Sequence, residues 1–299
     1  RLVTNRDQLA VAAAEMGYPC VMKIASAQIL HKTDIGGVLL NIGDEEKLLN
    51  GYDAMMAKVK SGAPAAVIAE PILSAGGVIV PPEGYFKALR QECEARGLML
   101  IFDEAQTAFG RIGEWFAADG LGVTPDIMAV SKTLGGGIPL AATITSDAIE
   151  EKAFESGFSH YPSHVSDPLP AAVGVAVLQT LKNENLIGRA KEMGAYLRDR
   201  MLDLQQKYEV IGEVRGQGLL LGVELVEDRE GRVPHHELGA KTTERCLELG
   251  LSMNIRRRPE RGSVWRIAPP LTVTMEEIDT ATAILDQALG ESLDALARG

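Results

Sequence analysis

Unbroken apolar runs of strand length recur along the middle of the chain, and they restrict the fold more than any other feature. A strand with one face in water alternates apolar and polar residues, whereas an unbroken run indicates burial on both faces. Helical apolar stripes separate these runs, and such alternation of strands and helices favours a mainly parallel sheet. We therefore expect an α/β fold. The expected strands of its sheet are residues 66–70, 98–102, 127–130 and 140–145.

The composition narrows the class of protein further. A chain of 299 residues with 46% hydrophobic content can bury a sizeable core. Its net charge of −11 argues against a nucleic-acid partner, which would need a basic face. Its 3 cysteines form no CxxC pair, which argues against a disulfide framework and fits a reducing compartment. Neither a membrane-length apolar stretch nor a signal-peptide pattern is found, so we expect a cytoplasmic protein without a membrane partner.

Changes in the pattern divide the chain into three expected domains. Residues 1–64 form a small α/β piece that ends in the breaking sequence Ser61-Gly62-Ala63-Pro64. Residues 65–180 carry the apolar strands of a large-domain portion. A long helical stripe then begins, so we expect residues 181–299 to form a smaller C-terminal α+β domain.

Charged side chains stand where three of the expected strands end, namely Glu70, Asp103 and Lys132. Ligands of open α/β sheets bind at the carboxyl ends of the strands, although polar residues also stand there because strands end at the surface. A lysine in this place can hold a carbonyl cofactor as a Schiff base. A neighbouring carboxylate can keep a pyridine nitrogen protonated, and the glycines at 135–137 let the backbone pass close to a ligand.

Four segments resemble the class III aminotransferases, which are pyridoxal-phosphate (PLP) enzymes of fold-type I. They are Ala69-Glu70-Pro71-Ile72, Asp103-Glu104-Ala105-Gln106-Thr107, Ser131-Lys132-Thr133-Leu134-Gly135 and Arg266-Ile267-Ala268-Pro269-Pro270-Leu271. The resemblance implies the fold-type I large-domain sheet, here incomplete, followed by a small C-terminal domain. It also implies PLP as the cofactor, an amino acid and a 2-oxo acid as substrates, and a homo-oligomer.

The same resemblance implies roles for single residues. Lys132 would bind PLP covalently, and Asp103 would pair with the pyridinium nitrogen. Gln106 would contact the ring hydroxyl, and Ser163 would contact the phosphate across a dimer. Arg266 would hold the substrate carboxylate through a two-pronged contact, which guanidinium geometry favours.

Three further segments resemble one member of this class, 2,2-dialkylglycine decarboxylase. They are residues 163–170, 218–224 and 249–255. The resemblance places Glu70 and Ser74 with Arg266 in the substrate pocket. Ala75 stands where the decarboxylase has a serine, so one pocket hydroxyl is missing.

An alkali cation is also implied by the resemblance to the decarboxylase. Ser163, Val165 and Asp167 fall where that enzyme binds the ion. Oxygen ligands of this hard type suit K⁺ or Na⁺.

The first 64 residues resemble a different family. Residues 17–24 and 29–38 look like part of the ATP-grasp domain of ADP-forming acyl-CoA synthetases. Lys23 would match a lysine that contacts nucleotide phosphates. The alternative is a strand-end lysine without a nucleotide, and we favour it because no later ATP-grasp metal site follows.

The resemblances together predict a hybrid chain: an ATP-grasp-like fragment joined to the C-terminal two thirds of a PLP enzyme. Its inherited reaction would be decarboxylation of a 2,2-disubstituted amino acid followed by amino transfer to a 2-oxo acid. The family's N-terminal half, with its phosphate cup, is expected to be missing. Two alternatives stay open: an ordinary class III transaminase, and a non-catalytic chain that arose by recombination or misassembly.

Overall fold

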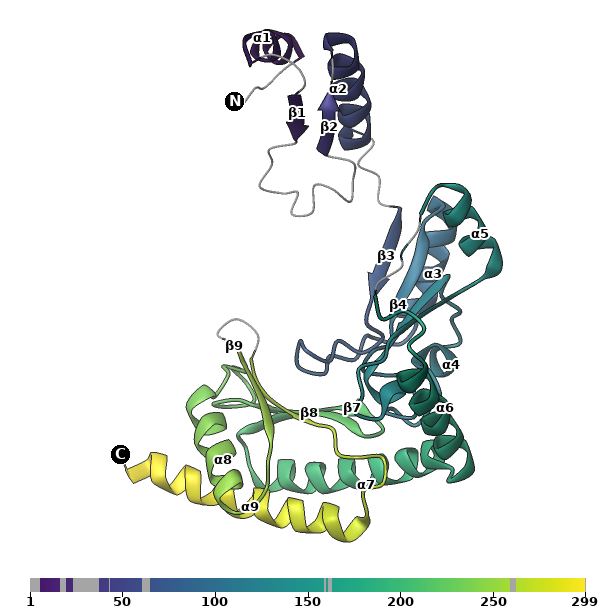
Figure 1. Cartoon of the computed structure of the whole chain (residues 1–299). Helices are drawn as coiled ribbons and strands as arrows, with labels where there is room; N and C mark the ends of the chain where they lie inside the picture. The colour runs from purple at the N-terminus through teal and green to yellow at the C-terminus, as the bar shows by residue number, and fades with distance from the viewer. Residues whose placement is uncertain are drawn as a thin grey trace. The chain divides into compact units, whose positions relative to one another are not determined.

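The computed structural model describes most of the chain, namely residues 6–16, 20–23, 38–42, 44–60, 65–158, 160, 163–258 and 262–298. It divides into two compact units, Arg1–Pro64 and Ala65–Gly299 (Figure 1). Among the helices that it describes, none combines the length and apolarity that a membrane crossing needs.

The first unit pairs two helices with a short antiparallel hairpin. In chain order it comprises α1 (Arg6–Met16), β1 (Cys20–Lys23), β2 (Val38–Ile42) and α2 (Glu45–Lys60). Alanines of α1 are buried, as are Ile42 and Leu48, and Arg6 of α1 forms an ion pair with Asp53 of α2 at 3.2 Å. This unit therefore has a small apolar interior of its own.

The second unit begins with a sheet of four strands in the order β3-β4-β5-β6. The strands are β3 (Ala66–Ala69), β4 (Met99–Asp103), β5 (Ile127–Val130) and β6 (Ala142–Thr145). The first three are parallel, and β6 is antiparallel to β5. Helices α3 (Tyr85–Arg96) and α4 (Ala117–Leu121) connect the parallel strands, and α5 (Asp147–Glu155) follows the last strand of the sheet.

The expectation that all four strands are buried on both faces is wrong, most clearly for the outer two, and even the inner strands are only partly covered on one face. In the central strand β4, Leu100 and Phe102 are fully buried and pack with Phe86 of α3. Side chains alternate along a strand, so Ile68 of β3 points away from this packed face and is 66% exposed. Ile144 of β6 is likewise exposed. A continuous apolar run thus indicates a strand but does not ensure that both faces are covered.

The second sheet of this unit is antiparallel throughout, with the order β7-β8-β10-β9. Its strands are β7 (Ile211–Gln217), β8 (Leu220–Leu225), β9 (Asn254–Arg258) and β10 (Gly262–Ile267). The helices of this region are α6 (Pro168–Asn183), α7 (Leu186–Lys207), α8 (His236–Glu248) and α9 (Met275–Arg298). Figure 1 shows the long helices α7 and α9 side by side, and the largest core cluster is buried among them and the sheet.

A close backbone contact joins the 104–116 segment to the β7–β8 turn and to α7. A Cβ at Gly218 would lie 2.4 Å from the Ile112 carbonyl carbon, and one at Gly194 would lie 2.3 Å from the Gly218 carbonyl carbon. The Arg111 Nη1 atom donates to Leu219 O at 3.2 Å and to Pro269 O at 2.5 Å. Glycine contacts and the half-buried guanidinium of Arg111 therefore help to join the two sheets of the second unit.

Replacing Gly194 with Ala should lower the free energy of unfolding by about 1–3 kcal/mol, because the new methyl group has no room against Gly218. Gly120→Ala is the matched control, since the nearest atom to its Cβ position lies 3.5 Å away. This control should stabilise the protein by up to about 1 kcal/mol through helix propensity. Urea denaturation measures both, and equal values would contradict the close contact at Gly194.

Candidate active site

The carboxyl ends of β3, β4 and β5 lie at one edge of the parallel sheet and carry three of the predicted residues. Ala69 pairs with Phe102, and Asp103 pairs with Ala129. Glu70 therefore follows β3 beside the end of β4, and Lys132 follows β5 three positions after the partner of Asp103. The register brings Glu70, Asp103 and Lys132 to a common edge, as the sequence predicts.

Lys132 stands in a backbone conformation that its side chain disfavours. Its φ is 51°, a left-handed value that costs free energy for a residue with a Cβ atom. It begins a short 3₁₀ turn, Lys132–Gly135, and its side chain is exposed. A Cβ at Gly136 would lie 2.8 Å from the Val177 Cγ2 atom of α6. Helix α6 thus fixes the turn that presents the lysine.

The three residues predicted for the substrate pocket form one hydrogen-bonded cluster. Ser74 is fully buried, and its backbone N–H donates to the Glu70 Oε2 atom at 3.2 Å. The Arg266 Nη1 atom donates to the Ser74 Oγ atom at 3.3 Å. Arg266 is 192 residues away from Ser74 in sequence, so the tertiary fold alone brings it to the strand-end edge.

The residues predicted for the alkali cation lie at a hollow that borders the strand-end edge through Ala105 and Ser131. Val165 and Asp167 line this hollow of about 920 Å³ beside β5 and β6, and Ser163 is exposed in the same turn before α6. The Asp167 Oδ2 atom already bonds the His164 ring at 2.9 Å. Within the described residues, no group of three or more His, Cys, Asp or Glu side chains is arranged to hold a metal ion.

The two remaining predicted residues are Gln106 and Lys23. Gln106 is half-buried in the segment after Asp103, and the Asp103 Oδ1 atom accepts the Ala105 N–H at 3.0 Å, so the loop that carries Gln106 turns at Asp103. Lys23 is the last residue of β1 and pairs with Val38. Its side chain lies outside the described residues.

Glu104 is a buried carboxylate to which the sequence analysis assigns no role. It is 0% exposed. Its Oε2 atom accepts from the Thr107 hydroxyl at 2.5 Å and from the Ala117 N–H at 3.0 Å, and its Oε1 atom accepts from the Ala118 N–H at 2.9 Å. Burial raises the pKa of this carboxyl group. Glu104 thus ties the segment after Asp103 to the start of α4, a contact whose only local sequence signal is Thr107 three residues later.

A profile of class III aminotransferases matches residues 8–289 of the chain. The chain belongs to the class III aminotransferase family. PLP is the cofactor of this family, and an amine transaminase from an uncultivated Pseudomonas species is a similar structure in PLP-bound form. The two chains are 33% identical in sequence and superpose with a TM-score of 0.71. The match covers 81% of this chain and 55% of the transaminase chain.

Curated relatives point to the same family. An uncharacterised aminotransferase of Schizosaccharomyces pombe is 47% identical over 246 residues, which is 82% of this chain and 55% of the relative. An acetylornithine aminotransferase of Methanosarcina mazei is 39% identical over 224 residues, 75% of this chain and 52% of the relative. An alanine/serine racemase of Pyrococcus horikoshii is 37% identical over 232 residues, which is 77% of this chain and 47% of the relative. The chain spans about half the length of the curated relatives it matches.

The fold prediction is confirmed by solved structures. A Bacillus anthracis aminotransferase has a TM-score of 0.74 at 31% identity, over 82% of this chain and 56% of its own. The second unit thus has the α/β fold-type I architecture of PLP transaminases. These relatives fit the ordinary class III transaminase alternative better than the decarboxylase interpretation.

Glu104→Gln should lower the free energy of unfolding by about 2 kcal/mol, because the amide N–H₂ would face buried donors instead of accepting from them. Asp119→Asn is the matched control at the same helix. Its carboxylate accepts the Phe116 N–H at 3.3 Å in an exposed position, and its loss should cost less than about 1 kcal/mol. Chemical denaturation compares the two variants, and a neutral Glu104→Gln would show that the buried contacts stabilise nothing.

Proposed function

We propose that this chain carries the cofactor-binding part of a PLP-dependent class III aminotransferase that moves an amino group from an amino acid to a 2-oxo acid. The observation that supports this most is the common strand-end edge of Asp103 and Lys132 in a chain of this family. The adjoining cluster of Glu70, Ser74 and Arg266 offers a guanidinium for a substrate carboxylate.

The residues at this edge fit PLP. Lys132 is exposed and stands two residues after the last residue of β5, which suits covalent attachment to a carbonyl carbon. Asp103 stands on the neighbouring strand, where a carboxylate can hold a proton on a pyridine nitrogen. When bound, PLP supplies an electron sink for the bonds at the amino acid α-carbon.

The chain's own residues would share the remaining work. The Lys132 Nζ atom, once free of the cofactor, would move a proton at the substrate α-carbon. Gln106 would donate to the ring hydroxyl, and Ser163 would contact the phosphate across a dimer. Arg266 would bind and orient the substrate carboxylate, since a guanidinium forms paired hydrogen bonds with it.

Decarboxylation-dependent transfer is the second candidate. Its support is the resemblance of residues 163–170, 218–224 and 249–255 to 2,2-dialkylglycine decarboxylase, together with the hydrogen bond from Arg266 to the Ser74 hydroxyl. In that case Ser163, Val165 and Asp167 would hold K⁺ or Na⁺. Release of CO₂ from 2-methylalanine in potassium or sodium buffer distinguishes this reaction from plain amino transfer.

The resemblance of the first unit to part of an ATP-grasp domain is a separate hypothesis. Its support is the sequence of residues 17–38, most of which lies outside the described residues. We do not assign nucleotide binding to Lys23, because a lysine at a strand end needs further phosphate and metal ligands to form such a site.

Borohydride reduction in the presence of PLP should label Lys132, and peptide mapping identifies the labelled residue. Lys132→Arg should abolish the label because a guanidinium forms no stable Schiff base. Lys191→Arg is the matched control: Lys191 is a surface lysine paired with Glu114 at 3.3 Å, and its replacement should leave the label in place. A label spread over many surface lysines would contradict the proposed attachment site.

Asp103→Asn should reduce amino transfer by about 10²–10³-fold, as expected when a charge that stabilises the transition state is removed. Asp119→Asn, an equivalent change on an exposed carboxylate, should retain nearly full activity. Initial rates with L-alanine and a 2-oxo acid measure both variants. Comparable losses in the two would argue against pairing of Asp103 with the pyridine nitrogen.

A further inference from the structure

The loop after β3 contains a compact turn that holds Ser74. We call residues 73–79 the Ser74 turn. Its ends pair through Leu73 N to Ile79 O at 2.9 Å and Ile79 N to Leu73 O at 3.2 Å. Val78 in its middle is buried with a φ of 55°. A residue with a Cβ atom adopts this conformation where its surroundings impose it, so something outside the turn must hold it.

The antiparallel sheet holds the Ser74 turn from outside. Its strands β7, β8 and β10 each contribute one residue, and the three residues lie directly opposite one another across the strands. Gly222 of β8 pairs with Arg215 of β7 on one side and with Arg266 of β10 on the other. Residues that pair directly across antiparallel strands point to the same face. Arg215 and Arg266 therefore flank a glycine on one face of the sheet.

The Ser74 turn crosses the sheet over that glycine. A Cβ at Gly222 would lie 2.9 Å from the Val78 Cβ atom and 3.0 Å from Gly77 O. The Arg215 Nε atom donates to Gly77 O at 2.9 Å, while the Arg266 Nη1 atom donates to the Ser74 Oγ atom at 3.3 Å. One arginine thus holds the backbone of the turn, and the other contacts its serine.

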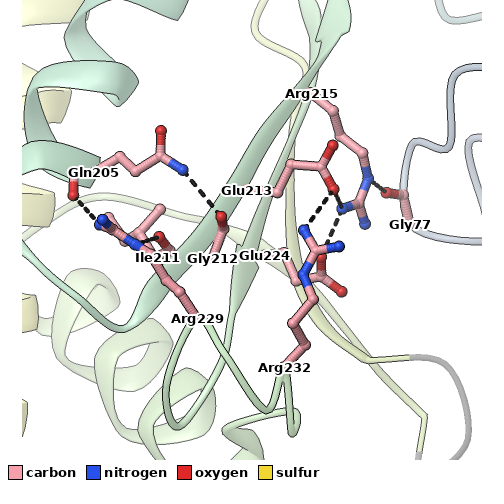
Figure 2. A network of polar contacts seen from close by, with 9 residues as sticks. All are labelled: Gly77, Gln205, Ile211, Gly212, Glu213, Arg215, Glu224, Arg229 and Arg232. Atoms are coloured by element: carbon pink, nitrogen blue, oxygen red, sulfur yellow. Dashed lines mark hydrogen bonds and ion pairs between the residues drawn. The ribbon is translucent and has the colours of Figure 1, made fainter.

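Two carboxylates fix the first arginine in place. The Arg215 Nη1 atom bonds the Glu224 Oε2 atom at 2.8 Å and the Glu213 Oε2 atom at 2.9 Å, and its side chain is 14% exposed. Figure 2 shows this arrangement, with the Nε–H of Arg215 directed at Gly77. Because these two ion pairs hold the Arg215 guanidinium in place, it restrains the position of the Ser74 turn.

We propose that Arg215 is a positioning residue: by clamping Gly77 it keeps Ser74 on Arg266 and so maintains the arginine in position for a substrate carboxylate. This inference rests on the proposed function. It deepens that function because Arg215 would then govern the preference for amino acids over amines that lack a carboxylate.

The first test needs no activity. Hydrogen exchange of the full chain, followed by mass spectrometry, should show amides of the Ser74 turn exchanging about 10- to 100-fold faster in Arg215→Met, because a charge-assisted hydrogen bond is lost. Gly222→Ala should have the same local effect through its methyl group. Arg229→Met is the matched control: Arg229 donates to Ile211 O at 3.1 Å and Tyr208 O at 3.0 Å in the same unit, and its loss should leave the turn protected.

The second test compares turnover of L-alanine and ethylamine, which differ by the carboxylate. Arg215→Met and Gly222→Ala should lower kcat/KM for L-alanine about tenfold or more, mostly through KM, and leave ethylamine unchanged. Arg215→Lys should recover part of the loss, and Arg229→Met should keep the wild-type ratio.

Unchanged hydrogen exchange in the Ser74 turn of the Arg215 variant would contradict the clamp. Faster exchange with an unchanged ratio of L-alanine to ethylamine turnover would contradict the role of Arg215 in carboxylate binding. If the wild-type chain converts neither L-alanine nor ethylamine, the proposed function is rejected, and the role of Arg215 in carboxylate binding is rejected with it. The exchange data would still show whether Arg215 holds the Ser74 turn.

Discussion

The parallel register of β3, β4 and β5 is the constraint on which the candidate site depends. Parallel strands end at the same edge, so Glu70, Asp103 and Lys132 converge although 62 residues separate the first from the last. The register itself depends on the packing of β4, whose Leu100 and Phe102 are completely buried against α3. The convergence of these side chains is thus a consequence of the core beneath them.

Glycines determine how closely the two sheets of the second unit approach each other. Gly218 admits the backbone of Ile112, and Gly222 admits the Ser74 turn. A side chain at either place would separate the strand-end edge from the antiparallel sheet that carries Arg266. In the proposed function, the parallel sheet would supply the residues that bind the cofactor, and the antiparallel sheet would supply the guanidinium that binds a carboxylate.

Buried charged groups stabilise the loops around the site. Glu104 gathers three donors from the segment after Asp103 and from α4, and Arg111 donates to carbonyl groups near the β7–β8 turn and after β10. Burial lowers the pKa of Arg111 and raises that of Glu104, so each group loses hydration that its hydrogen bonds must replace. We infer that these residues maintain loop geometry and do not take part in the reaction itself.

The sequence by itself determined the strands of the first sheet of the second unit, the residues at the strand ends and the family, because apolar periodicity and short motifs are local properties. It also predicted Glu70, Ser74 and Arg266 as one group, through resemblance. Tertiary structure decided which strand faces are covered, as the exposure of Ile68 shows, and it decided that Glu104 is buried. It alone placed Arg215, Gly222 and Arg266 in one row. The pairing of distant strands depends on how whole layers pack, and no local pattern around Gly222 records which turn will cross it.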